Sequence, residues 1–184
     1  VTTTIALPPD TAYQRLIYTQ LDPSPQTVTV DPDGNWLAEY LLKPKTILEI
    51  TATGNALLYL KPTVPVPPPS PEQLTNSLQP QPFWPTGDSA IKDLAQKLKT
   101  PQNIYNYVAT NLTYNYDRIE ANLDRLGAKA ALENPQNAIC TEFTDLFVAL
   151  ARAANIPARD INGFAFTSNP QLKPLSLKKD ILHA

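Results

Sequence analysis

The chain has 184 residues, 42% of them hydrophobic, which is enough for one medium core or two small ones. Its 15 Lys and Arg against 17 Asp and Glu give a formal charge of −2, so there is no basic field to attract nucleic acid. The sequence contains neither an apolar run of membrane-spanning length nor a signal-peptide pattern, and we expect no membrane contact from this segment. A single Cys and a single His allow no intrachain disulfide and suggest no metal cluster, so no metal and no cofactor are expected.

Methionine is absent, even at position 1, which predicts a processed or trimmed chain. Localisation and oligomeric state are left open by the sequence.

Strand periodicity dominates residues 14–60, where Trp36, Ala38 and Tyr40 alternate with their neighbours as half-buried strands require. Residues 31–35 and 53–55 contain the Gly and Asn of tight hairpins. We therefore expect five or six short antiparallel strands, a small sandwich or partial barrel, in a first domain over residues 1–62.

Prolines are concentrated in residues 61–71, where their fixed φ values and missing amides favour extended polyproline II. We interpret residues 63–71 as a semi-rigid linker between two domains. A docking ligand for an SH3-like partner is the alternative use of such a segment.

Helical signals follow the linker. Ser70 and Gln73 form a capping-box pattern for a short helix, residues 91–98 carry an apolar stripe, and Thr100 precedes a proline that starts a third helix. The tyrosine-rich residues 112–117 are compatible with a loop or an edge strand. Upstream of these, Phe83 and Trp84 are assigned to core packing rather than to the wall of a groove.

The strongest pattern is the amphipathic helix of residues 140–154, which begins with the only cysteine. Asn137 is a plausible cap, which places Cys140 in the first helical turn. Glu142 and Asp145 are interpreted as structural charges of that turn. After the helix, Asn155 fits a left-handed C-cap and residues 158–166 alternate like a strand.

A helix N-terminus favours the thiolate, the form of cysteine that attacks carbonyl carbon, and its free amides can hold an oxyanion. These properties suggest Cys140 as a catalytic nucleophile. The alternative is that Cys140 is a small core residue, as lone cysteines often are.

The run from Cys140 to Arg159, with its Asn-Ile-Pro-Ala-Arg turn and Gly163 beyond, resembles the core of the transglutaminase-like superfamily, in particular its microbial, cysteine-protease branch. The resemblance implies an α+β fold. In this fold an N-terminal antiparallel β-domain precedes a papain-like or transglutaminase-like core over residues 72–184, C-terminally incomplete here.

The resemblance also implies a catalytic Cys-His pair. Its histidine position matches His183, the only histidine, which is followed by the expected Ala184. The aspartate that orients the histidine is expected beyond Ala184, and that role is not assigned to Asp160 or Asp180. The chain as given is therefore expected to show little activity.

Three positions depart from the family pattern. Ala138 stands where a glycine is usual, which removes the freedom of a positive φ before the cysteine. Thr141 stands where tissue-type transglutaminases carry Trp, and Asn155 replaces the glycine of the turn.

The resemblance implies a bacterial two-domain enzyme that forms a thioester acyl-enzyme on protein or peptide amides. Hydrolysis, as by a peptidase or amidase, is favoured over cross-linking because the microbial branch is used more often in that way. The alternative is a non-catalytic protein-binding or scaffold module on a degenerate fold.

Overall fold

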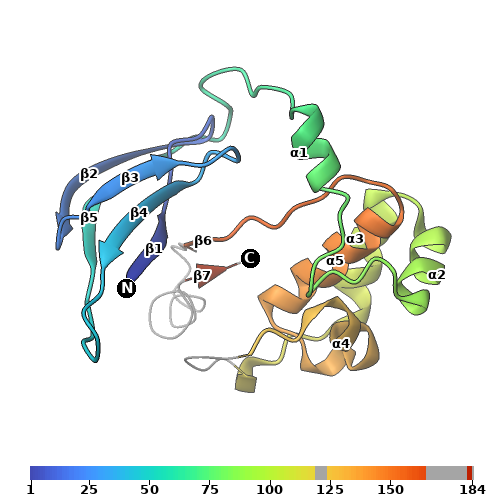
Figure 1. The fold of residues 1–184 in the computed structure, drawn as a ribbon. Helices are drawn as coiled ribbons and strands as arrows, with labels where there is room; N and C mark the ends of the chain where they lie inside the picture. Colours follow the sequence, from blue (N-terminus) through green and yellow to red (C-terminus); the bar gives the residue numbers. More distant parts are fainter. Residues whose placement is uncertain (119–123, 165–181, 184) are drawn as a thin grey trace. The chain divides into compact units, whose positions relative to one another are not determined.

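A computed structural model describes residues 1–118, 124–164 and 182–183 of the chain. The chain divides into two compact units, Val1–Pro69 and Ser70–Ala184. The first unit is formed by β-strands, and helices dominate the second (Figure 1).

The first unit contains five strands in two antiparallel sheets. They are β1 (Thr2–Leu7), β2 (Gln14–Asp22), β3 (Thr27–Val30), β4 (Trp36–Leu41) and β5 (Thr51–Leu58). One sheet has the order β1-β4-β3, and the other pairs β2 with β5. Strand β1 lies outside the range that periodicity indicated, because its three threonines mask any polar-apolar alternation.

One of the two predicted hairpin turns is confirmed and the other is wrong. Asp31 accepts hydrogen bonds from the amides of Asp33 and Asn35, and Gly34 has a φ of 87° in the turn between β3 and β4. Gly54 instead lies inside β5, opposite Tyr18. A Cβ at Gly54 would lie 2.3 Å from the carbonyl oxygen of Ile17, so glycine serves close backbone approach there.

The described residues of the second unit form five α-helices. They are α1 (Pro71–Asn76), α2 (Ser89–Leu98), α3 (Pro101–Asn111), α4 (Gly127–Glu133) and α5 (Cys140–Ala153). Short 3-10 turns occupy Tyr116–Arg118 and Pro135–Asn137, and two-residue strands β6 (Gly163–Phe164) and β7 (Leu182–His183) pair antiparallel.

Local side-chain caps define the starts of α1, α2 and α3, as the sequence predicted for α1 and α3. The Ser70 hydroxyl accepts from the Gln73 amide while the Gln73 side chain accepts from the Ser70 amide. Thr100 caps α3 and Asp88 caps α2. Helix α4 was not predicted from the sequence, although its Ala-Lys-Ala-Ala-Leu-Glu run consists of strong helix formers.

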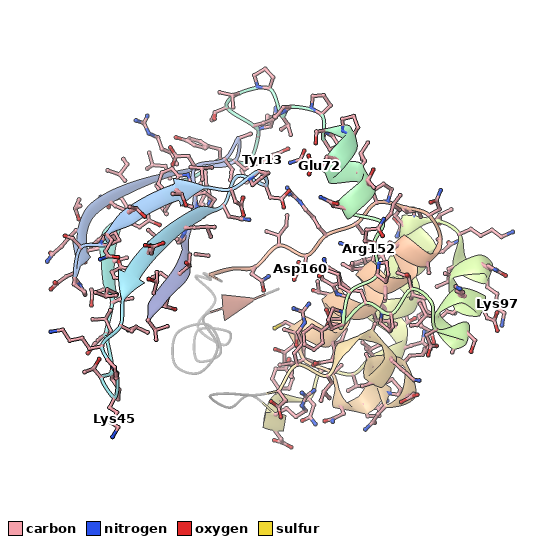
Figure 2. The ribbon with its side chains drawn as sticks, in the orientation of Figure 1. Tyr13, Lys45, Glu72, Lys97, Arg152 and Asp160 are labelled. Atoms are coloured by element: carbon pink, nitrogen blue, oxygen red, sulfur yellow. The ribbon has the colours of Figure 1, made fainter. Side chains whose placement is uncertain are left out.

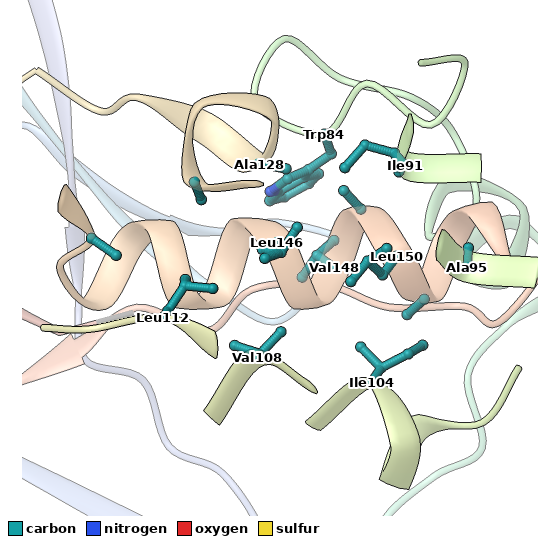
Figure 3. Close-up of a cluster of buried hydrophobic side chains, with 14 residues drawn as sticks. Trp84, Ile91, Ala95, Ile104, Val108, Leu112, Ala128, Leu146, Val148 and Leu150 are labelled. Atoms are coloured by element: carbon teal, nitrogen blue, oxygen red, sulfur yellow. The ribbon is translucent and has the colours of Figure 1, made fainter. Parts of the chain in front are cut away.

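The core of the second unit surrounds α5. In Figure 3, side chains that include Trp84, Ile91, Ile104 and Val108 lie around Leu146 and Leu150 of α5. All of these side chains are buried, and buried residues occur along most of the length of α5. The apolar residues that recur at helical spacing in the sequence of α5 are therefore the ones that pack this helix against its neighbours.

The end of α5 follows the predicted turn. Asn155 has a φ of 60°, and the amide of Ile156 donates to the carbonyl of Ala151 at 2.9 Å. The strand expected over 158–166 is wrong for residues 158–162, which are irregular, and residues 165–166 lie outside the described ranges. No helix within the described ranges has the length and apolar character needed to cross a membrane.

Candidate active site

Cys140 is the first residue of α5, as the sequence predicted, and it is half-buried. The N-cap is Ile139 rather than Asn137, which lies in the preceding 3-10 turn. An isoleucine side chain has no acceptor, and Ile139 makes no side-chain cap hydrogen bond. The first-turn amides next to the thiol therefore receive no cap from the residue that usually supplies one.

The chain approaches Cys140 in extended conformation. Ala138 is fully buried and has a φ of −95°, a value that any residue adopts. The glycine that the family usually carries here is therefore not required by the backbone of this chain.

A tyrosine-rich segment runs beside this approach. Tyr114 forms a parallel bridge with Ala138, and the amide of Asn115 donates to the Ala138 carbonyl at 2.7 Å. Residues 112–117, for which the sequence allowed a loop or an edge strand, thus form a single β-bridge followed by a 3-10 turn.

Aromatic rings extend from this segment to α5. The Tyr114 ring centroid lies 4.8 Å from that of Tyr116 and 6.1 Å from that of Phe143, one turn beyond Cys140. Tyr116 is 60% exposed, so part of this aromatic group faces solvent near the start of α5.

Two acidic residues of α5 are buried, each with an arginine partner. Glu142 and Asp145 are both 0% exposed and form ion pairs with Arg118 and Arg125, respectively. They were predicted to be structural, but as charges of the first turn rather than as buried groups. The available signal was their spacing of three residues on a mainly apolar helix, which places both on one side.

The Asp145 pair is reinforced by a tryptophan. Both carboxylate oxygens of Asp145 accept from the Arg125 guanidinium, and one also accepts from Trp84 Nε1 at 2.6 Å. Burial raises the pKa of Asp145, against the hydrogen bonds from Arg125 and Trp84, which lower it. The same Asp145 hydrogen bond raises the pKa of Arg125.

Trp84 is buried, as predicted, and its ring contacts two cations. The guanidinium carbon of Arg152 lies 4.4 Å from its ring centroid and that of Arg125 lies 5.6 Å from it. Phe83 is 37% exposed and lies under Arg125, so its assignment to core packing is wrong.

Arg152 joins three segments by backbone contacts. It donates to the carbonyls of Ala158 at 2.8 Å and Gln79 at 2.6 Å, and burial lowers its pKa. Figure 2 labels Arg152 on α5 and Asp160 on the segment that follows it. Asp160 accepts from Arg125 at 3.4 Å and so belongs to this arginine network.

The structure places His183 on β7, opposite Gly163 of β6. Its side chain and Asp180 lie outside what the structure describes. The pairing of His183 with Cys140 therefore stays a prediction.

The described residues around the thiol form no cluster of metal-binding side chains. Groups of three or more His, Cys, Asp or Glu that could hold a metal ion do not occur in residues 1–118, 124–164 and 182–183. An open hollow of about 510 Å³ lies instead at the C-terminal end of α5, far along the helix from Cys140, and is lined by Ala95, Gln96, Lys99, Ala153, Ala154 and Asn155.

The part of the chain that carries the thiol, the tight turn and the antiparallel strand pair matches a known family. The family model of the transglutaminase-like superfamily matches residues 87–184, more than half of the chain. The chain belongs to the transglutaminase-like superfamily.

The fold of the whole chain is similar to a known structure. The crystal structure of a "Putative Cysteine Protease" from Cytophaga hutchinsonii aligns with a TM-score of 0.66 and 18% sequence identity, covering 99% of this chain and 65% of that one. The chain thus spans less than two thirds of that relative's length, and the likeness establishes the α+β fold. No match was found among curated proteins.

Proposed function

We propose that this protein is a cysteine enzyme that cleaves protein or peptide amides through a thioester acyl-enzyme, with Cys140 as nucleophile and His183 as general base. The observation that carries the proposal is the half-buried thiol at the first position of α5, in a chain of the transglutaminase-like superfamily. The protease name of the structurally similar protein supports hydrolysis over cross-linking.

In the first step, the proton of Cys140 passes to His183 and the thiolate Sγ forms a bond to the amide carbonyl carbon. The negative charge that develops on the carbonyl oxygen is stabilised by the uncapped first-turn amides of α5. Collapse of this intermediate breaks the C–N bond, and the amine leaves with the proton from His183.

In the second step, water attacks the thioester carbonyl while His183 takes its proton. The C–S bond breaks, which releases the carboxylic acid and restores the thiol. A primary amine in place of water would give a cross-linked amide, so the two reactions differ only in the acceptor.

The test uses the complete natural protein with a labelled peptide amide in water enriched in ¹⁸O. Cys140→Ala and Cys140→Ser should each lower turnover by at least about 10³-fold, since no other residue of the chain carries a thiol. Hydrolysis predicts one ¹⁸O atom in the acid product, even with a fluorescent primary amine present. Exclusive incorporation of the amine would establish cross-linking instead.

His183→Gln is the second variant, because glutamine retains a polar side chain but cannot shuttle a proton. We expect a loss of about 10²–10⁴-fold with an unchanged unfolding midpoint. Full activity in the Cys140 variants would contradict the assignment of Cys140 as the nucleophile. A wild type without activity on peptide amides would favour a protein-binding module.

A further inference from the structure

Glu142 connects three segments that meet at the start of α5. Its Oε1 accepts from the Leu126 amide at 2.9 Å, and its Oε2 accepts from the Ile139 amide and from Arg118 Nη1, each at 3.0 Å. The carboxylate is 0% exposed, so these contacts are made away from water. Charge-assisted hydrogen bonds of this kind are among the stronger ones in proteins.

Arg118 extends these contacts to the chain before the thiol. Its Nη1 also donates to the carbonyl of Asn137, and its Nη2 donates to the carbonyl of Asp124 at 3.2 Å. The Glu142–Arg118 pair therefore holds both the amide of the N-cap and a carbonyl two residues before it.

This pair takes the place of a conventional cap. The Ile139 side chain cannot accept a hydrogen bond from the first-turn amides, so no N-cap side chain fixes where α5 begins. The start of α5 is fixed instead by Glu142, a residue inside the helix, which accepts a hydrogen bond from the Ile139 amide. Cys140 directly follows Ile139, and its backbone position depends on that contact.

We propose that Glu142, held by Arg118, is a positioning residue for Cys140, which keeps Sγ at the first-turn amides while those amides stay free of a capping side chain. The proposal rests on the proposed function of Cys140 as nucleophile. A serine or aspartate cap would hold the helix start but would occupy the amides that the oxyanion needs.

Asp145 offers a matched control one turn further along α5. It is equally buried and also paired with an arginine, but its partners are Arg125 and Trp84. It has no hydrogen bond to residues 137–139 within the part of the chain that the structure describes. Loss of its charge should affect the fold without moving the thiol.

The experiment compares Glu142→Gln and Asp145→Asn in the complete natural protein, at a temperature where both are folded. Two quantities are measured: the rate of Cys140 alkylation by iodoacetamide at neutral pH, and kcat and KM for a peptide amide. Glu142→Gln should slow alkylation at least about threefold, because Sγ leaves the helix N-terminus. It should lower kcat about tenfold or more with KM nearly unchanged, because small displacements of a nucleophile are costly.

Asp145→Asn should leave alkylation and kcat within about twofold of the wild type. Equal effects of the two variants, in proportion to their loss of stability, would show a merely structural role and overturn the proposal. Arg118→Lys keeps the charge but loses the forked contact, and should give an intermediate alkylation rate. Should Glu142→Gln fail to fold, Arg118→Lys decides by the same criteria, with a wild-type alkylation rate contradicting the proposal.

The alkylation rate needs no substrate, so it separates two failures. An inactive wild type whose alkylation still depends on Glu142 would refute the proposed function and leave the positioning role standing. Normal turnover with no dependence on Glu142 would refute the positioning role alone.

Discussion

The two units of this chain reach stability with very different interiors. The buried apolar core of the β-unit consists of Leu7, Ala38 and Tyr40, and every residue of β3 and β5 is exposed. The helical unit buries 14 apolar residues around α5 among the residues that the structure describes. Because hydrophobic burial is the main favourable term in folding, the difference predicts that the thiol is carried by the more rigid unit.

Buried charge follows the same division. Among the residues that the structure describes, the buried charged side chains are Glu142, Asp145 and Arg152, all on α5. A polar network of this kind needs surrounding packing to hold every partner in place. The β-unit has only a small buried core, and its carboxylates are exposed or half-buried.

The largest expected contrast comes from the same substitution in both units. Leu150→Ala, at a fully buried position of α5, should cost about 2–5 kcal/mol of unfolding free energy because it leaves a cavity. Leu41→Ala in β4, where leucine is 57% exposed, should change it by less than about 0.5 kcal/mol. Native-state hydrogen exchange of α5 and β4 amides measures each unit, and equal losses would contradict the comparison.

For a matched pair of Gly→Ala substitutions, the loss of unfolding free energy should be larger in the β-unit than in the helical unit. Gly54→Ala should cost roughly 1–3 kcal/mol in the β-unit, because the new Cβ meets the backbone of Ile17. Gly87→Ala in the helical unit meets nothing within 4 Å and should be neutral or stabilising by up to about 1 kcal/mol. The same exchange measurement, on amides of β2 and α2, tests both, and a neutral Gly54→Ala would show that β2 and β5 adjust easily.

The smallest expected effects are in pH dependence, and they should have opposite signs. Burial raises the pKa of Asp145 above 3.8, so its contribution to stability is full below 3.8 and is lost as the pH rises through the raised value. Hydrogen bonds from Asn35 lower the pKa of Asp31, so its contribution is present above 3.8 and is lost as the pH falls through the lowered value.

NMR titration of the two carboxyl groups measures these shifts directly. Unfolding curves of Asp145→Asn and Asp31→Asn, compared with the wild type across the acid range, should show differences that slope in opposite directions. Slopes of the same sign would mean that Arg125 and Trp84 outweigh burial at Asp145.

Short-range features were readable from the sequence alone. The capping box of Ser70, the turn at Asp31 and the left-handed Asn155 each depend on a few adjacent residues. Their hydrogen bonds close within about one helical turn, so the local pattern suffices to predict them.

The tertiary structure decided the features whose partners are distant. The sequence around Gly54 is typical of a turn, but Gly54 pairs with Tyr18 and is part of a strand. Glu142 and Asp145 have the composition of surface charges, yet arginines 24 and 20 residues away and Trp84, 61 residues away, allow them to be buried. A charge is buried only where packing brings its counter-charge to it, and no local pattern carries that information.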